Sequence, residues 1–293
     1  MAPAIEEHRF TIPGAGGVPI AAYRWKASGP RPVRGVLQIA HGLGEHALRY
    51  PPALGQVFEA GYAVFANDHR GHGASVRDEA GLGSFGAGGF PALVDDMAHL
   101  TRTARSEYPA MPLILLGHSM GSFAAQLFMI EHADSVDGVA LSGSAALDGL
   151  LKARALAPDP FAFYNAFFEP ARTAFDWLTQ DEKIVDAYIA DPRCGFQLDT
   201  PSRASLNRAA GRLADPEELR RIRPDLPVYL LAGDADPINL RLSLLHLLMA
   251  RYRQAGMTRL DYDFYPGARH EVLNEVNRDV VVGRLLDWMN RIS

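Results

Sequence analysis

The stretch LLGHSMGS, residues 115–122, places Ser119 between Gly117 and Gly121 in a G-x-S-x-G sequence. An apolar run precedes this stretch and a helical pattern follows it, which is the strand–turn–helix context of a nucleophilic serine. At such a sharp turn flanking glycines avoid a Cβ clash, and the following helix directs its first N–H groups toward the hydroxyl. The pattern predicts Ser119 as a nucleophile. The alternative is an ordinary glycine-containing turn.

On both sides of this stretch, short apolar runs alternate with segments of helical spacing. The strand-like runs are 35–40, 62–66, 113–116, 138–141 and 228–232, and the helical segments are 50–60, 90–108 and 119–132. The pattern continues as a helix, a strand and a helix over 238–254, 260–264 and 271–292, and two runs within 10–25 suggest a β-hairpin. Runs that are apolar on both faces suit a parallel sheet covered by helices. We expect an α/β fold with a mostly parallel, doubly wound sheet.

The segment 148–223 interrupts this alternation, because it contains no buried-strand run. It holds helical pieces and the aromatic run FAFYNAFF, residues 161–168. We predict a helical lid here, inserted into a core formed by 1–147 and 224–293, because an insertion of this length needs its own purpose. The alternative is a helical connection that packs beside the sheet, with the aromatic residues serving only packing.

A serine nucleophile needs a base, which follows the acid in chain order in sheets of this type. Two histidines follow the last long apolar strand. His246 lies within an apolar helical pattern and suits a packed or groove position, whereas His270 lies in a Pro/Gly loop between a predicted strand and the final helix. We predict His270 as the base.

The acid that orients the base is expected in the loop AGDADP, residues 232–237. Asp234 falls within the tight glycine turn, where a backbone hydrogen bond is the simpler role. Asp236 precedes Pro237, which disfavours a helical conformation and keeps Asp236 in the loop. We predict Asp236 as the acid and keep Asp234 as the alternative.

An oxyanion needs backbone donors close to Ser119. One is expected at Met120, directly after the nucleophile, and the second in the loop AHGLGEH, residues 40–46, where we choose Leu43. Each such donor stabilises a transition state by roughly 3–4 kcal/mol. His41 and His46 are expected to hold this loop rather than transfer protons.

Three motifs together carry a family resemblance: HGLGEHALRY (41–50), DHRGHGAS (68–75) and GHSMGS (117–122). With GDAD and PGARHE, they resemble the monoacylglycerol lipase and lysophospholipase group of α/β-hydrolases, often labelled serine aminopeptidase-like. The resemblance spans nearly all of the chain and is weakest over 148–223. It implies an α/β-hydrolase fold, the triad Ser119, Asp236 and His270, the oxyanion donors Leu43 and Met120, no metal and no organic cofactor. It also implies a small-molecule acyl ester as substrate.

The composition of the chain limits which other classes of function are possible. The chain has 293 residues, 48% of them hydrophobic, and 29 basic against 34 acidic residues give a net charge of −5. Without a basic surplus we expect no nucleic-acid partner. The single Cys194 forms no internal disulfide, and the N-terminus carries no apolar run of signal-peptide length, so we expect a cytoplasmic protein. Membrane contact is expected to be at most transient and through the lid.

Three other functions are weighed against ester hydrolysis. The G-x-G-x-x-G match at Gly81–Gly86 follows no strand, which disfavours a dinucleotide site, and no metal-binding spacing is present. An aminopeptidase on the same fold would need carboxylates of the lid near the pocket. The candidates for this role are Asp176, Asp181, Glu182 and Asp186. A C–C bond hydrolase shares the triad, and a non-catalytic binding module would lack one of its members.

Overall fold

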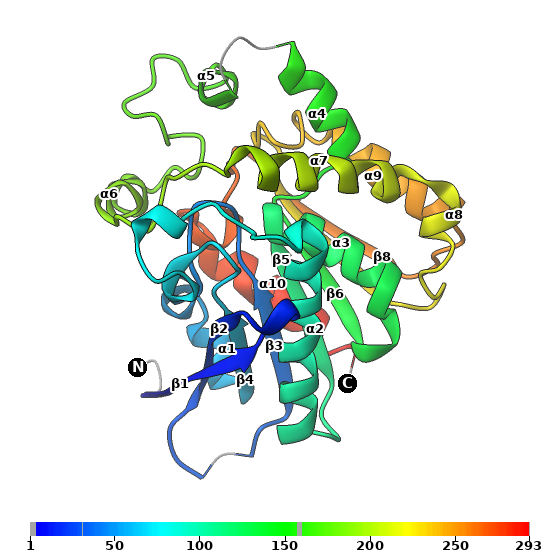
Figure 1. Cartoon of the computed structure of the whole chain (residues 1–293). Coiled ribbons are helices and arrows are strands. Elements are labelled where there is room, and N and C mark those ends of the chain that lie inside the picture. Colours follow the sequence, from blue (N-terminus) through cyan, green and yellow to red (C-terminus); the bar gives the residue numbers. More distant parts are fainter. Residues whose placement is uncertain (1–3, 31, 157–159, 293) are drawn as a thin grey trace.

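The described residues form one eight-stranded, mostly parallel sheet with helices on both faces (Figure 1). The computed structural model describes residues 4–30, 32–156 and 160–292, without the side chains of 160–162. The strand order is β1-β2-β4-β3-β5-β6-β7-β8. The strands are β1 (Ile5–Pro13), β2 (Pro19–Ala27), β3 (Gly35–Ala40), β4 (Tyr62–Asn67), β5 (Leu113–His118), β6 (Gly138–Ser142), β7 (Val228–Gly233) and β8 (Leu260–Tyr265).

The pairing pattern explains why the inner strands are apolar on both faces. β1 pairs antiparallel with β2, and β2 with β4, while all later neighbours are parallel, with Val36 opposite Leu113 and Ile114 opposite Gly138. Parallel strands are linked by helices that cover the sheet. The predicted hairpin and doubly wound sheet are therefore confirmed.

Alternate residues of each inner strand enter opposite cores. In β3, Val36 and Ala40 belong to the core with α2 and α3, whereas Leu37 and Ile39 belong to the core with α1 and α10.

The helices are α1 (Gly55–Glu59), α2 (Gly89–Glu107), α3 (Met120–His132), α4 (Leu147–Ala155), α5 (Pro160–Asn165), α6 (Glu182–Ala190), α7 (Thr200–Ala214), α8 (Pro216–Leu219), α9 (Ser243–Gln254) and α10 (Arg278–Met289).

Helices α4 to α8 all lie between β6 and β7, and no strand occurs among the described residues of this segment. We call residues 143–227 the helical segment. The predicted lid, 148–223, falls inside it. Figure 1 shows α4, α5 and α6 beyond one end of the sheet, on the side where β5 leads into α3.

Three predicted helices are shorter than expected. Residues 51–53, which begin with Pro51 and Pro52, form a 3-10 turn, and α1 begins only at Gly55. The segment 238–242 is also not helical, since Leu240, Arg241 and Leu242 all have positive φ. The final helix begins at Arg278 rather than at residue 271. None of the described helices is both long and apolar enough to cross a membrane.

Candidate active site

Ser119 occupies a strained turn between β5 and α3. Its φ of 52° and ψ of −119° lie in a region that L-residues rarely adopt. A Cβ on Gly117 would come within 2.5 Å of the Gly121 carbonyl oxygen, and one on Gly121 would overlap the Ala40 carbonyl. Both flanking positions therefore require glycine, and the turn leaves Ser119 half-buried at the entrance of α3.

His270 and Asp236 meet at the carboxyl end of the sheet. His270 follows β8, Asp236 follows β7, and His270 Nδ1 lies 3.0 Å from Asp236 Oδ2. The Asp236 carboxylate also accepts hydrogen bonds from the Ile238 N–H at 2.8 Å and from the Asn239 side chain at 3.3 Å. Three donors thus fix the orientation of Asp236. Because Nδ1 of His270 contacts Asp236, the second ring nitrogen, Nε2, is the one that can serve a ligand in the cavity.

The two alternative residues lie elsewhere. Asp234 Oδ1 accepts a hydrogen bond from the Gly267 N–H at 2.7 Å, which is a turn-stabilising role. His246 lies exposed on α9 against Phe264, with ring centroids 5.4 Å apart, rather than packed in the core. Neither residue lines the cavity beside Ser119.

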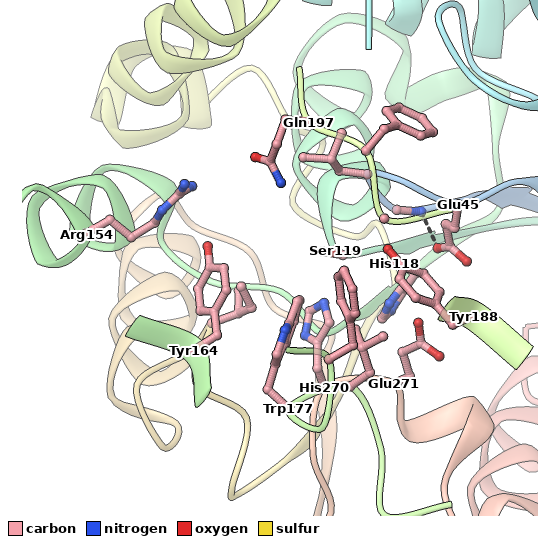
Figure 2. A pocket seen from close by; sticks show the side chains of 17 residues that line it. Glu45, His118, Ser119, Arg154, Tyr164, Trp177, Tyr188, Gln197, His270 and Glu271 are labelled. Carbon is pink, nitrogen blue, oxygen red and sulfur yellow. Dashed lines mark hydrogen bonds between the residues drawn. The ribbon is translucent and has the colours of Figure 1, made fainter. Parts of the chain in front are cut away.

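Ser119 and His270 line the same cavity, of about 680 Å³ (Figure 2). No hydrogen bond joins the Ser119 hydroxyl to the His270 ring within the part of the chain that the structure describes. The His270 ring packs between His118 and Trp177, whose ring centroids lie 4.8 and 5.0 Å away. Catalytic hydrogen bonds often tighten only when substrate binds, so this arrangement suits a resting site.

Charges around His270 set its protonation. Burial alone would lower the pKa of His270, but the charge and hydrogen bond of Asp236 outweigh it, with help from Glu271 and Glu45, and raise the pKa above its ordinary value. Burial, together with the nearby His270, lowers the pKa of His118 to about 4. His118 therefore stays neutral and does not compete for the proton.

The loop after β3 lies directly against Ser119. A Cβ built on Gly42 would stand 3.2 Å from the Ser119 Cβ, so the next residue, Leu43, is held beside the hydroxyl. Leu43 and Met120 both line a further cavity together with Ser119. Across the described residues, neither the Leu43 N–H nor the Met120 N–H is engaged by a protein acceptor. Both are available to a ligand.

A buried ionic network holds this loop, and the sequence analysis did not single it out. Glu45 accepts hydrogen bonds from the Gly42 N–H at 2.6 Å and from the Tyr50 hydroxyl at 2.8 Å. Arg49 binds Glu45 at 2.5 Å and Glu271 through two bonds of 2.8 Å. Burial alone would raise the pKa of Glu45, but Arg49 holds it well below its usual range.

The sequence indicates only part of this network. Glu45 and Arg49 are four residues apart, the spacing of a helical ion pair. Glu271, the third member, follows His270 directly but is 222 residues from Arg49. His41 and His46 hold neighbouring parts of the loop: His41 Nε2 accepts from the His69 N–H at 2.9 Å, and His46 Nε2 lies 2.9 Å from Asp191 of the helical segment.

A second cavity, of about 570 Å³, also opens at Ser119, and its wall is mainly aliphatic. Its apolar lining residues are Leu43, Met120, Phe123, Leu147, Leu150, Leu151, Leu198, Leu206 and Ile238. Of the aromatic run, Tyr164 borders both cavities, Phe163 packs against Phe167, and the side chain of Phe161 lies outside the described residues.

One group of residues has the composition of a metal site. His46, Asp191 and Cys194 bring ligand atoms within 4.8 Å of one another. Burial raises the pKa of the Cys194 thiol to about 12, so the thiol stays protonated.

The G-x-G-x-x-G match lies in a loop that packs on the helical segment, where Gly83 meets the Gln197 carbonyl. Neither feature reaches Ser119.

The sheet order, the strained serine turn and the loops converging on it define an α/β-hydrolase. A carboxyl esterase from Bacillus coagulans, solved in complex with glycerol, superimposes with a TM-score of 0.85 over 98% of both chains at 26% identity. The monoacylglycerol lipase of Mycolicibacterium smegmatis is 29% identical over 285 residues, covering 97% of this chain and 96% of that protein. The human monoglyceride lipase is 28% identical over 267 residues, covering 87% of this chain and 82% of that protein.

Residues 31–277 match the family described as serine aminopeptidase, S33. The chain belongs to this family of α/β-hydrolases, and the expected fold and family resemblance are confirmed.

Proposed function

We propose that the chain is a serine carboxylic ester hydrolase for acyl esters of lipid type, such as monoacylglycerols or lysophospholipids. Ser119 is the nucleophile, His270 the base and Asp236 the acid. The observation that carries the proposal is the 3.0 Å contact between His270 Nδ1 and Asp236 Oδ2, beside a cavity that Ser119 also lines. The names of the relatives support the same chemistry.

The proposed reaction follows from these positions. His270 accepts the Ser119 proton as the hydroxyl oxygen attacks the ester carbonyl carbon, and Asp236 stabilises the resulting imidazolium. The Leu43 and Met120 N–H groups donate to the oxyanion. When the carbon–oxygen bond to the alcohol breaks, His270 protonates the leaving oxygen. Water, deprotonated by His270, then releases the acid from the acyl-enzyme and restores Ser119.

We further propose that residues 148–223 act as a lid and that the second cavity takes the acyl chain. Its aliphatic wall is contributed by α3 on the sheet side and by α4 and α7 of the helical segment. Burying an apolar chain there contributes about 0.8 kcal/mol per methylene. A transient contact of the lid with membranes remains a prediction.

The structure disfavours the aminopeptidase alternative. The four carboxylates considered for binding a free amino terminus line neither cavity at Ser119. Asp176 caps a local turn at Arg172 and Thr173, and Asp181 caps α6. The carboxylates in the first cavity, Glu45 and Glu271, are both bound to Arg49.

The test compares acyl esters with amino-acid anilides and uses a fluorophosphonate probe. Wild-type protein should hydrolyse p-nitrophenyl and glycerol esters, and the probe should label Ser119. Turnover of anilides in preference to esters would reassign the chain as a peptidase. Failure of both turnover and labelling would favour a binding module.

A further inference from the structure

The second cavity changes character along α4. Its apolar end includes Leu147 and Leu150, which are each 2% exposed. Its open end carries Arg154, the exposed Arg203 and Asn207, and Gln197. Leu147 and Arg154 are seven residues apart on α4, which corresponds to about 10 Å along a helix axis. The cavity is therefore amphiphilic along its length.

Arg154 faces the space beside Ser119, and no described residue serves as its counter-ion. It lines both cavities, and Figure 2 shows its side chain on the same side of the pocket as Tyr164 and Gln197. Its guanidinium carbon lies 5.6 Å from the Tyr164 ring centroid, and its buried Nε has no acceptor. No carboxylate of the described residues forms an ion pair with it.

The acidic residue of α4 is already occupied. Asp148, on the same helix as Arg154, is held by Arg251 at 2.6 Å and by Lys152 at 3.6 Å. Among the described residues, Arg203 donates to the Leu198 carbonyl, at 3.3 Å, and to no carboxylate. The described lining of the second cavity thus holds two arginines and no acidic side chain. A partly buried cation without a partner is costly, and a ligand anion would remove that cost.

We propose that Arg154 and Arg203 form an anion-binding subsite at the open end of the second cavity. The preferred ester then carries a carboxylate or phosphate, separated from its carbonyl by an apolar chain. This inference rests on the proposed ester hydrolase function and names its substrate class. The planar guanidinium of Arg154 suits two-point binding of such anions, and the amides of Gln197 and Asn207 add donors.

Two kinds of ester would place an anion at this subsite. One carries a carboxylate at the far end of its acyl chain. A phosphate on the alcohol side is the other source of the same chemistry.

The experiment uses two matched pairs of esters. The first pair is mono-p-nitrophenyl octanedioate and p-nitrophenyl octanoate, which differ in a terminal carboxylate. The second is a 1-acylglycerol-3-phosphate and the corresponding 1-acylglycerol. We expect the kcat/KM ratio of the anionic to the neutral member to fall about 10- to 100-fold in Arg154→Gln, as for a lost charge-assisted hydrogen bond. Arg154→Lys should retain part of the ratio, and Arg203→Gln should lower it less.

The matched control is Arg208→Gln, an exposed arginine of α7 that lines neither cavity at Ser119. It should leave both ratios unchanged. The ester pair whose kcat/KM ratio falls in Arg154→Gln shows whether the anion is on the acyl side or on the alcohol side of the ester. Ratios that are equal in wild type and in both arginine variants, for both pairs, would overturn the subsite.

A binding measurement separates this inference from the proposed function. In Ser119→Ala, calorimetric titration with octanedioate and octanoate should show tighter binding of octanedioate, and Arg154→Gln in that background should remove the difference. If no ester is hydrolysed but this preference is present, the reaction is wrong and the subsite stands. Equal binding of the two acids would reject the acyl-side subsite even in an active esterase.

Discussion

The cavity beside Ser119 has two walls of different construction. The wall on the sheet side comes from loops after β3, β5, β7 and β8, and its ionisable groups are buried and bonded to one another: Asp236, Glu45 and His270 are each less than 5% exposed. The opposite wall comes from α4, α5, α6 and α7, is mostly apolar, and carries Arg154, which forms no ion pair with a described residue. The sheet wall, with its bonded groups, suits the proposed bond-breaking steps, and the helical wall suits the proposed choice of substrate.

The largest expected effect tests whether the sheet wall contains the chemistry. Ser119→Ala should lower p-nitrophenyl ester turnover by at least about 10⁴-fold, as in hydrolases that lose their nucleophile. The melting temperature should change little, because the substitution removes one half-buried hydroxyl. Turnover at the wild-type rate would place the reaction on another residue.

A second substitution compares two neighbouring carboxylates on the same wall. Asp236→Asn should reduce kcat by about 10⁴-fold, because the amide favours the wrong His270 tautomer. Asp234→Asn keeps an oxygen that accepts from the Gly267 N–H and loses only the charge, so it should cost at most about 1 kcal/mol of stability while turnover stays within a few-fold of wild type. If Asp234→Asn is the damaging change instead, the acid has been assigned to the wrong residue.

These two walls were not equally predictable from the sequence. The apolar runs fix the strands, and the glycines around Ser119 fix its turn, because local sterics allow few alternatives. Asp236 could be preferred over Asp234 from the adjacent Pro237 alone. The network of Glu45, Arg49 and Glu271 was not predicted, since it joins residues 222 positions apart through the fold.

The helical wall was less predictable for a different physical reason. Its presence followed from the missing strand pattern, but the residues that face Ser119 depend on how short helices pack. The positive φ values at Leu240–Leu242 likewise override a helical periodicity that begins at Ile238. Arg154 carries no local signal, since its lack of an ion-pair partner among the described residues is a property of three-dimensional packing.

The third prediction concerns the ionic network that supports the sheet wall. Glu45→Gln keeps one oxygen for the Gly42 N–H but replaces the oxygen that binds Arg49 by an NH2 group. Arg49 is left with one carboxylate, so the loop that carries Leu43 should loosen. We expect kcat/KM to fall about 10- to 100-fold through misplacement of the oxyanion donor. The cost in stability should not exceed about 3 kcal/mol, since Glu271 still pairs with Arg49.

The same variant should shift the pH profile in a defined direction. The proposed reaction needs neutral His270, so kcat/KM of the wild type should rise with pH through a midpoint above 6.5, the ordinary histidine value, because the pKa of His270 is raised. Glu45 contributes to that increase, so Glu45→Gln should move the midpoint to lower pH. A profile identical to that of the wild type, with reduced kcat, would limit Glu45 to holding the loop.

The smallest expected effect tests the helical wall. Leu151 lines the second cavity, so Leu151→Trp should fill its acyl path and lower kcat/KM for long-chain esters by a few-fold to about tenfold relative to short ones. Leu156→Trp is the control, since Leu156 ends the same helix and is 89% exposed. A series of p-nitrophenyl esters of increasing chain length measures both variants. Because neither substitution touches the sheet wall, activity on the shortest ester should stay close to wild type in both. A uniform loss across the series would mean that this wall also positions the reacting groups, and the division between the two walls would fail.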